Sequence, residues 1–358
     1  MKILFFYYGI DPNWLSLFTF PYALAKHADV IYYGKKGAYT IEEKPTEKSI
    51  PWQIYGHRVN HGILSKDMDA PEIIKKLYPK DYPDAVVTFF SPSTSITPKN
   101  FEKCKCLRVV WSIELHNTFS HSDVSRRLLQ WCKEKVNLVF KPSDPNNRLN
   151  QSNWLKETGV AVEMNIPSIN TDFFYDKQLP RKYDIANLFG CNTPEVYPLR
   201  WKIQETLRKQ EKWSYREIAY VWIKGEKFRI PGIPIRTLIR GEKYVDAICQ
   251  SRIFASGSGG YKPDYGILTM KWLEAPACNT LLMINKLTPP DDMNALGFKP
   301  DVNFVAINKN TFLERIQYYL SHPDEAKIIA QRGYDLIRSK NSQNIRAKEF
   351  IGKIRKHL

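Results

Sequence analysis

The sequence predicts an α/β protein with two doubly wound, Rossmann-like domains that face each other across a cleft. Short apolar runs alternate with helical segments, which is typical of parallel sheets covered by helices. This alternation starts twice, at the first residue and again after the polar residues 176–182. The chain has 358 residues, whereas a single hydrophobic core becomes inefficient beyond roughly 250–300 residues. Two domains are therefore expected.

The first series of apolar runs defines the N-terminal domain. The chain opens with MKILFFYYGI, an apolar run that breaks at Gly9 as a buried strand entering a loop does. A helix is expected over residues 15–26. Further buried strands are predicted where apolar runs end in turn or polar residues, at residues 29–33, 85–90, 107–113 and 136–140.

The second series defines the C-terminal domain and follows a linker-like stretch at residues 165–182. We place the domains at residues 1–175 and 176–335. Residues 336–358 are expected to form a basic helix, for which a return to the N-terminal domain is one option. Strands are predicted at residues 184–189, 217–223, 251–255, 280–284 and 303–307, and helices at 197–210, 244–250, 311–321 and 324–339.

Composition and charge exclude several classes of protein. No apolar run reaches the roughly 18–20 residues of a membrane span, and the N-terminal run lacks the features of a signal peptide. Six cysteines are too few for a disulfide scaffold, and Cys104 and Cys106 lack a second pair for a zinc site. We expect cytoplasmic residence, with peripheral attachment at the inner membrane surface as an option. The formal charge of +16 attracts polyanions, although a surface tuned for solubility also explains it.

The segment with the most chemical content spans residues 256–278. It opens with the small-residue loop SGSGGYKPD and continues into a helix expected to run from Tyr265 or Gly266 to Cys278. Because free N–H groups at a helix start favour phosphate oxygens, the start of this helix is expected to face a diphosphate. Glu274 continues the stripe of residues 266 and 270, and its carboxylate can accept two vicinal ribose hydroxyls. The residues of the helix start are Gly266, Ile267, Leu268, Thr269 and Met270.

Glu274 has a plain alternative, because a helix glutamate usually faces solvent. Its frame favours a site: KWLEAPACNTLLMI, at residues 271–284, resembles the motif of an acidic residue, Ala-x-Ala, a turn and a hydrophobic strand in GT-B glycosyltransferases of the family-4-like group. Residues 165–174 and 182–190 resemble further segments of that group in the same order. The resemblance implies a nucleotide-sugar-dependent enzyme of hexosyl or related type, with an N-terminal acceptor domain and a C-terminal donor domain.

Two positions depart from the motif of the group. That motif has two acidic residues separated by seven others, and Gly266 occupies the first of these positions; Asn279 replaces the usual glycine. Asp264 or Tyr265 is the candidate substitute for the missing acid. The departure resembles a divergent branch, the spore-coat-type glycosyltransferase-like proteins. Neither the donor sugar nor the retaining or inverting outcome can therefore be carried over.

Cations for a diphosphate are expected after the glycine turn at Gly190, where the resemblance places a basic residue. The candidates are Arg200 and Lys202, and a guanidinium makes the better bidentate phosphate contact. Lys224 and Lys243 are candidates for a second cation. Arg200 and Lys202 could instead be exposed helix charges, and Lys224 and Lys243 lie in or next to an irregular segment that is hard to align.

Candidate catalytic residues follow the N-terminal strands. Glu114 and His116 come after the strand at 107–113, where resembling proteins place a histidine or an acid near the reacting sugar. Either group could bind the sugar or accept a proton, while a packed loop histidine is the alternative for His116. Asp11, after the first strand, is a weaker candidate base.

Two acidic pairs resemble the acidic motifs that bind metal ions. Asp67-Met-Asp69 has the D-x-D spacing of metal-dependent transferases but lies outside any donor loop, so a surface turn is favoured, and Pro290–Asp292 has the same explanation. Helix N–H groups and basic residues can neutralise a leaving diphosphate without a metal. We therefore predict no catalytic metal and no cofactor other than the nucleotide-sugar co-substrate.

Together these features predict sugar transfer from a UDP- or GDP-linked donor to a lipid-linked, glycan or nucleic-acid acceptor. A lipid-linked acceptor fits the basic C-terminal helix, and DNA fits the charge of +16 equally well. The alternative function is a catalytically silent GT-B scaffold that binds a nucleotide or glycan, with Gly266 marking lost chemistry. A Rossmann oxidoreductase is disfavoured, because no G-x-G-x-x-G follows the first strand.

Overall fold

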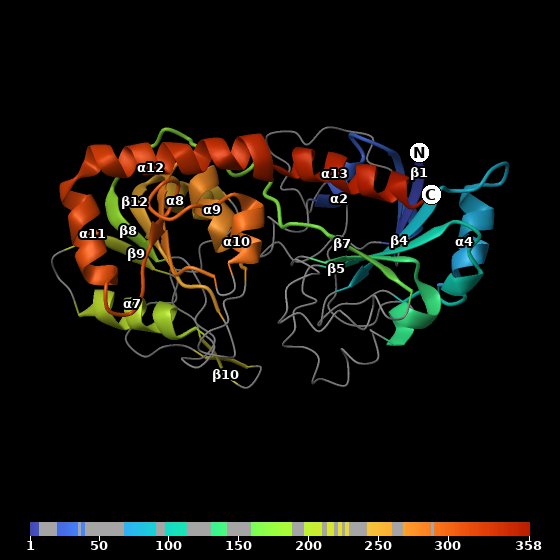
Figure 1. Ribbon diagram of the computed structural model, residues 1–358, viewed down its shortest axis with the longest axis horizontal. Coiled ribbons are helices and arrows are strands. Elements are labelled where there is room, and N and C mark those ends of the chain that lie inside the picture. Colours follow the sequence, from blue (N-terminus) through green and yellow to red (C-terminus); the bar gives the residue numbers. More distant parts are fainter. Residues whose placement is uncertain are drawn as a thin grey trace. The chain divides into compact units, whose positions relative to one another are not determined.

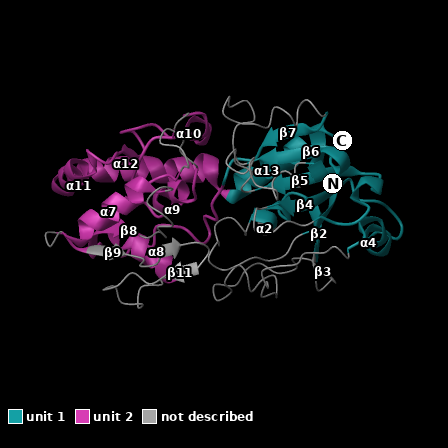
Figure 2. Ribbon diagram, turned by 90° about the horizontal axis from the view of Figure 1, so that it is seen from below, with its two compact units in different colours: residues 1–167, 343–358 teal, residues 168–342 magenta. Residues whose placement is uncertain are grey.

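The computed structural model divides the chain into two compact units, Met1–Pro167 with Gln343–Leu358 (unit 1) and Ser168–Ser342 (unit 2), which Figure 2 shows in different colours. The unit boundary precedes the one we expected at residue 175. The intervening segment belongs to unit 2 because Ile169 N–H donates to the Asn341 carbonyl and Phe174 is buried there. The structure describes residues 1–6, 20–34, 37–39, 68–90, 97–112, 130–141, 159–187, 197–209, 213–217, 221–223, 226–228, 242–259, 268–287 and 290–358.

Unit 1 contains a seven-stranded sheet in which every described pair is parallel except β2 with β3. The central strands are buried on both faces, as their continuous apolar sequences predict. The strand order is β3-β2-β1-β4-β5-β6-β7, so the chain reverses direction across the sheet between β1 and β4. The strands are β1 (Lys2–Phe6), β2 (Asp29–Gly34), β3 (Gly37–Tyr39), β4 (Ala85–Phe90), β5 (Leu107–Ser112), β6 (Leu138–Lys141) and β7 (Ala161–Met164).

The C-terminal helix α13 (Gln343–Lys356) packs within unit 1, although it is the last element of the chain (Figure 1). Phe350 lies against Phe140 and Phe20, with ring centroids 3.9 Å and 5.6 Å apart. The helix begins later than the expected residue 336, because a π-helical turn (Ile337–Asn341) precedes it. The other described helical segments of unit 1 are α2 (Phe20–Leu24), α4 (Ala70–Leu77), the 3₁₀ turn η2 (Phe101–Lys103) and residues 130–135.

Unit 2 contains a five-stranded parallel sheet with the order β14-β13-β12-β8-β9. The strand expected at residues 217–223 is wrong: Glu217 pairs with Asn187 in this sheet, whereas Val221 pairs with Phe228 in a separate hairpin. The sequence did not indicate that residues 217–223 belong to two different strands, because residues of the same apolar run form parts of both. The strands are β8 (Tyr183–Asn187), β9 (Tyr215–Glu217), β12 (Ser251–Ala255), β13 (Leu281–Ile284) and β14 (Val305–Ala306), and the hairpin is β10 (Val221–Ile223) with β11 (Glu226–Phe228).

The helices of unit 2 lie on both sides of this sheet, with α7 on one side and α8 and α9 on the other (Figure 1). The chain leaves β8 through α7 toward one edge and leaves β12 through α9 toward the other. Neighbouring strands β8 and β12 therefore form the topological switch point of the sheet. The helices are α7 (Pro198–Arg208), α8 (Glu242–Cys249), α9 (Lys271–Ala277), α10 (Asp291–Leu296), α11 (Phe312–Ser321) and α12 (Pro323–Leu336).

The described part of the chain holds no helix with the length and apolar character needed to cross a bilayer.

The packing of α12 against α9 depends on a glycine. A Cβ at Gly333 would lie 2.8 Å from the Asn303 carbonyl oxygen and 3.3 Å from Cβ of Pro276 in α9, whereas a Cβ at Gly352 in α13 would have no atom within 4 Å. We predict that Gly333→Ala lowers the free energy of unfolding by about 1–3 kcal/mol through overpacking. Gly352→Ala should raise it by up to about 1 kcal/mol through helix propensity. Thermal unfolding of both variants checks this, and shifts of the same sign and size would contradict it.

Candidate functional site

The candidate site lies at the switch point of the unit 2 sheet, beyond the carboxyl ends of β8 and β12. These strands are parallel neighbours, with Phe254 opposite Ala186. β8 ends at Asn187, and β12 leads into the loop 256–259. Open parallel sheets bind their ligands at this position, because the connections on the two sides leave in opposite directions and open a crevice. The residues around these strand ends are therefore the ones to examine for chemistry.

The loop that follows β12 is held in place from two directions. Ser258 N–H donates to Oδ1 of Asn285 at 2.6 Å, and its hydroxyl accepts from Nε1 of Trp272 at 2.9 Å. Trp272 is fully buried and packs against Phe304 with ring centroids 4.9 Å apart. The same indole thus fixes both the loop and the first turn of α9.

The glycines of this loop allow the start of α7 to approach closely. A Cβ at Gly257 would lie 3.1 Å from the Arg200 backbone nitrogen, and a Cβ at Gly259 would lie 2.2 Å from the Tyr197 ring. We had expected small residues here because a ligand approaches the backbone. In the described structure, the first turn of α7 occupies that space, and it brings Arg200 to the switch point.

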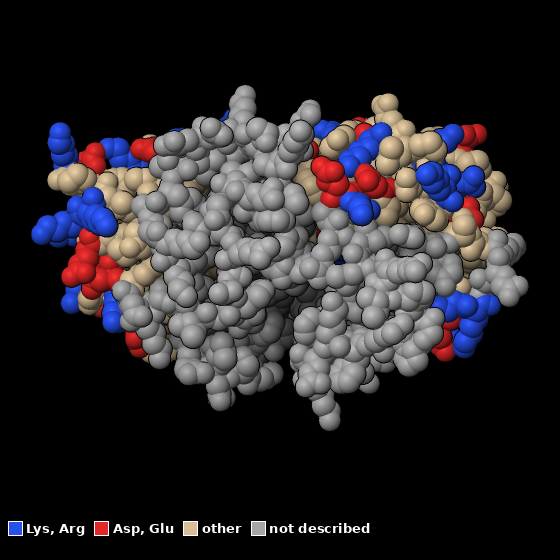
Figure 3. Space-filling view, turned by 180° about the vertical axis from the view of Figure 1, so that it is seen from behind, with Lys and Arg blue, Asp and Glu red and all other residues tan. Residues whose placement is uncertain are grey.

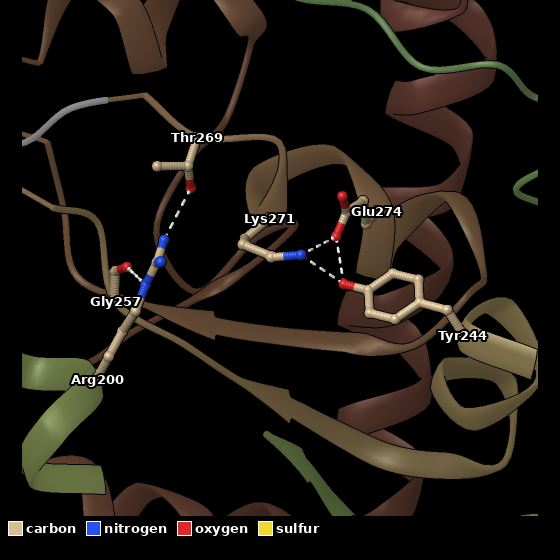
Figure 4. A network of polar contacts seen from close by, with 6 residues as sticks. All are labelled: Arg200, Tyr244, Gly257, Thr269, Lys271 and Glu274. Atoms are coloured by element: carbon tan, nitrogen blue, oxygen red, sulfur yellow. Dashed lines mark hydrogen bonds and ion pairs between the residues drawn. The ribbon is translucent and has the colours of Figure 1, made fainter. Parts of the chain in front are cut away.

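Arg200 is buried at the start of α7, with 5% of its surface exposed. Its Nε donates to the Gly257 carbonyl, and its Nη2 lies 3.4 Å from Oγ1 of Thr269 (Figure 4). The guanidinium carbon lies 4.1 Å from the centroid of the Tyr197 ring, a cation–π geometry. These contacts orient the guanidinium toward the segment that precedes α9.

Glu274 is buried on α9 and is part of a polar triangle with Lys271 and Tyr244 (Figure 4). Its Oε2 accepts from the Tyr244 hydroxyl at 2.5 Å and from Nζ of Lys271 at 2.6 Å. Nζ of Lys271 also donates to the Tyr244 hydroxyl at 2.5 Å and lies 4.8 Å from the Tyr244 ring centroid. A buried carboxylate needs such partners, because an isolated buried charge is strongly unfavourable. The solvent-facing alternative for Glu274 is therefore wrong.

The electrostatics of the triangle reflect its burial. Burial lowers the pKa of the Lys271 ammonium, while Glu274 raises it and Arg200 lowers it further. Burial, together with the charge of Glu274, raises the pKa of the Tyr244 hydroxyl well above its usual value. The region thus brings two cationic side chains, Lys271 and Arg200, near one carboxylate. An anionic ligand would be favoured in such surroundings.

Two further polar side chains are buried at the strand ends without a partner in the part of the chain that the structure describes. They are Asn187, through both atoms of its amide, and Ser256, through its hydroxyl. Both residues have no exposed surface. Buried polar groups almost always find a hydrogen-bond partner, so these two mark a place where a further polar group is expected.

The helix start proposed for diphosphate binding is wrong in its position. The helix α9 begins at Lys271, with Met270 as its N-cap, whereas we expected it to begin at Tyr265 or Gly266. Its first turn is formed by bonds from the Trp272 and Leu273 N–H groups to carbonyls three residues earlier, and no side chain caps it. Residues 268 and 269 lie outside this helix, and Gly266 lies outside the described residues, so of the expected stripe only Met270 and Glu274 can be placed on α9.

The structure separates the remaining candidates. Thr269 contacts Arg200, and Leu268 is buried. The Lys202 side chain is 54% exposed and lies 4.0 Å from Oε2 of Glu205, and Lys243 is exposed on α8; both take the surface alternative. Several candidates lie outside the described residues: Asp11, Glu114, His116, Gly190, Lys224, Asp264, Tyr265, Gly266 and Ile267.

The two acidic pairs have structural explanations where they are described. Asp69 caps α4 by accepting from the Glu72 N–H at 3.2 Å, and Asp67 lies outside the described residues. Asp292 is buried in the first turn of α10, so the surface turn expected there is wrong. Acidic residues in a first turn interact favourably with the helix dipole.

Sequence reasoning missed the partners of Glu274. We had read the helix containing Tyr244 as packing, and we had given Lys271 no role. The spacing of Lys271 and Glu274, three positions apart on a helix, was a signal available in the sequence. Tyr244 lies thirty positions away on another helix, and no local pattern reveals that contact.

A known family matches part of the chain. Residues 200–352, which include Arg200, Lys271 and Glu274, match the family described as glycosyl transferase-like. No curated protein gives a significant match.

Solved structures match the whole chain at low sequence identity. HepE from Anabaena, solved with UDP, has a TM-score of 0.59 at 10% identity and full coverage of both chains. Sucrose-phosphate synthase from Thermosynechococcus elongatus has a TM-score of 0.56 at 13% identity, covering 100% of this chain and 99% of that one. A glycosyltransferase from Rickettsia africae has a TM-score of 0.55 at 11% identity, with coverage of 99% and 98%. The fold class expected from the sequence is confirmed: the chain has the GT-B fold, and its residues 200–352 match the glycosyl transferase-like family.

Proposed function

We propose that this protein transfers a sugar from a nucleoside-diphosphate donor, bound at the switch point of unit 2, to an acceptor. The observation that carries the proposal is the buried Glu274 carboxylate, held beside Arg200 within the segment that matches the glycosyl transferase-like family. The related HepE structures contain UDP and UDP-glucose, which supports a uridine nucleotide as the donor. The structure of this chain offers the matching chemistry: a carboxylate for hydroxyls and a guanidinium for phosphates.

In the proposed complex, Glu274 accepts a hydrogen bond from the ribose and Arg200 faces the diphosphate. The guanidinium of Arg200 and the ammonium of Lys271 would interact favourably with the donor phosphates. Oriented cations of this kind stabilise a departing diphosphate without reorganising. We extend the proposal to transfer without a catalytic metal, with Thr269, Leu268 and Met270 forming the wall next to Arg200.

The catalytic assignment remains a proposal from the sequence. Glu114 or His116 would hydrogen-bond the reacting sugar or accept the acceptor proton, and Asp11 is the weaker candidate base. Asp264 or Tyr265 would contact the donor sugar in place of the acid missing at Gly266. Gly190, Ile267 and Lys224 stay secondary donor candidates.

Donor binding and turnover test this function together. Isothermal titration with UDP and GDP, and transfer or donor hydrolysis with UDP- and GDP-sugars in the presence of EDTA, should show binding and turnover by the wild-type protein. Glu274→Ala and Arg200→Met should each weaken nucleotide binding by about tenfold to a hundredfold, the range for losing a charged hydrogen bond. Lys202→Met, on the same helix as Arg200 but exposed, should bind like the wild type.

The outcomes separate the candidate functions. Full nucleotide affinity in Glu274→Ala would remove the donor-site assignment. Nucleotide binding without turnover on any donor would favour the silent GT-B scaffold. Turnover that EDTA abolishes and added magnesium restores would overturn metal independence alone.

For the acceptor, we propose a lipid-linked molecule at an anionic membrane surface. The helix α13 exposes Lys348, Arg355 and Lys356 on unit 1, the unit that corresponds to the expected acceptor domain. On the face of the molecule drawn in Figure 3, the described Lys and Arg side chains lie among Asp and Glu side chains. The exposed basic residues of α13 form a local group, which fits a contact with anionic lipid headgroups.

Sedimentation with liposomes tests the acceptor proposal. The wild-type protein should sediment with vesicles containing anionic lipid, and Arg355→Glu combined with Lys356→Glu should reduce the bound fraction severalfold, since each basic residue near the surface contributes roughly 1 kcal/mol. Neutral vesicles are the control. A gel shift with duplex DNA at the same ionic strength, without sedimentation on anionic vesicles, would overturn the proposal in favour of a nucleic-acid acceptor.

A further inference from the structure

The side-chain hydrogen bonds of Glu274 involve one of its two carboxylate oxygens. The hydrogen bonds from Tyr244 and Lys271 both end on Oε2, and the third bond of the triangle joins those two donors to each other (Figure 4). Within the described residues, Oε1 receives no hydrogen bond, yet it is absent from the side-chain atoms that are both sealed from solvent and unpartnered. Glu274 retains 5% of its surface, and Oε1 is therefore the oxygen still within reach of a ligand.

We propose that Lys271 and Tyr244 are positioning residues that hold Glu274 through Oε2, so that its carboxylate meets the donor with Oε1 alone and reads one ribose hydroxyl. This inference rests on the proposed donor site. Each carboxylate oxygen has about two lone-pair directions, and both directions of Oε2 are taken by protein donors. Two vicinal hydroxyls bound in bidentate fashion would need both oxygens.

The construction of the triangle favours positioning over simple charge neutralisation. Tyr244 comes from α8 and Lys271 from α9, so the carboxylate is fixed from two helices. The Tyr244 ring is held in turn by Phe174, with ring centroids 6.4 Å apart, and by the ammonium of Lys271 at 4.8 Å. The Lys271 side chain is 19% exposed, so little water competes for its hydrogen bonds. A carboxylate fixed in this way loses less conformational entropy when it binds a hydroxyl.

Deoxynucleotides test the inference on the wild-type protein. Titration with UDP, 2′-deoxy-UDP and 3′-deoxy-UDP, and with the matching GDP series, should give one deoxynucleotide that binds within twofold of the parent and one that binds at least tenfold more weakly. Equal weakening for the two deoxynucleotides would mean bidentate reading and would overturn the inference, as would no weakening for either.

Variants of Tyr244 and Lys271, the two residues that hold Glu274 and that we call the clamp, add a readout that a merely structural role would not change. Tyr244→Phe and Lys271→Met each remove one of the two hydrogen bonds that hold Oε2. The carboxylate can then turn more freely, so the difference between the two deoxynucleotides should shrink at least threefold. Lys177→Met removes a comparable partly buried ion pair, with Asp246, and Tyr319→Phe removes the hydroxyl of another buried tyrosine of unit 2; both should keep the wild-type difference. An unchanged difference in folded Tyr244→Phe, checked by circular dichroism, would overturn the clamp.

Failure of the clamp and failure of the proposed function give different results. If no nucleoside diphosphate binds the wild-type protein, the donor site itself is refuted and the clamp with it. If nucleotides bind, and Glu274→Ala weakens them, but the deoxynucleotide pattern is absent, the donor site stands and only the clamp is refuted.

Discussion

The candidate site of unit 2 depends on supplying hydrogen-bond partners to one carboxylate that is buried inside a hydrophobic domain. Glu274 lies among apolar residues of α9, where an unpaired charge would be expensive, and the ammonium of Lys271 and the hydroxyl of Tyr244 meet that need. This requirement ties α8 to α9. It also explains why the neighbourhood is rich in aromatic rings, since Tyr244 and Trp272 combine apolar surface with a polar atom at the edge.

The sheet topology supplies the second half of the site. Because β8 and β12 are adjacent but lead to opposite edges, the first turn of α7 and the loop after β12 meet over the strand ends. Because residues 257 and 259 are glycines, the first turn of α7 can approach the loop after β12 closely, and Arg200 becomes buried and oriented as a result. The unpartnered amide of Asn187 and hydroxyl of Ser256 lie at the same strand ends, which is consistent with a site whose polar contacts are completed by a ligand.

Local sequence patterns predicted the features that depend on local chemistry. The alternation of apolar runs and helices predicted two doubly wound sheets, and the frame around Glu274 predicted the glycosyltransferase-like character, which residues 200–352 confirm. What the patterns could not predict was set by contacts between distant residues. The pattern around Tyr244 predicted only a packed helix, because the hydroxyl of Tyr244 finds its partner, Glu274, on another helix. The helix α9 begins later than expected because Trp272 is anchored to Ser258 of the preceding loop. The apolar run 217–223 could not reveal that its two ends pair with different partners.

The assignment of α13 to unit 1 has a consequence for how the protein is made. Unit 2 is one continuous stretch of chain, so it can fold as soon as residue 342 has left the ribosome. The core of unit 1 includes Phe350, Ile351 and Ile354, which follow the whole of unit 2 in the sequence. During translation the apolar surface around Phe20 and Phe140 therefore lacks the cover of α13 until unit 2 has been synthesised. Unit 1 can be completed only after unit 2, and a protein truncated before α13 would leave this surface open to aggregation.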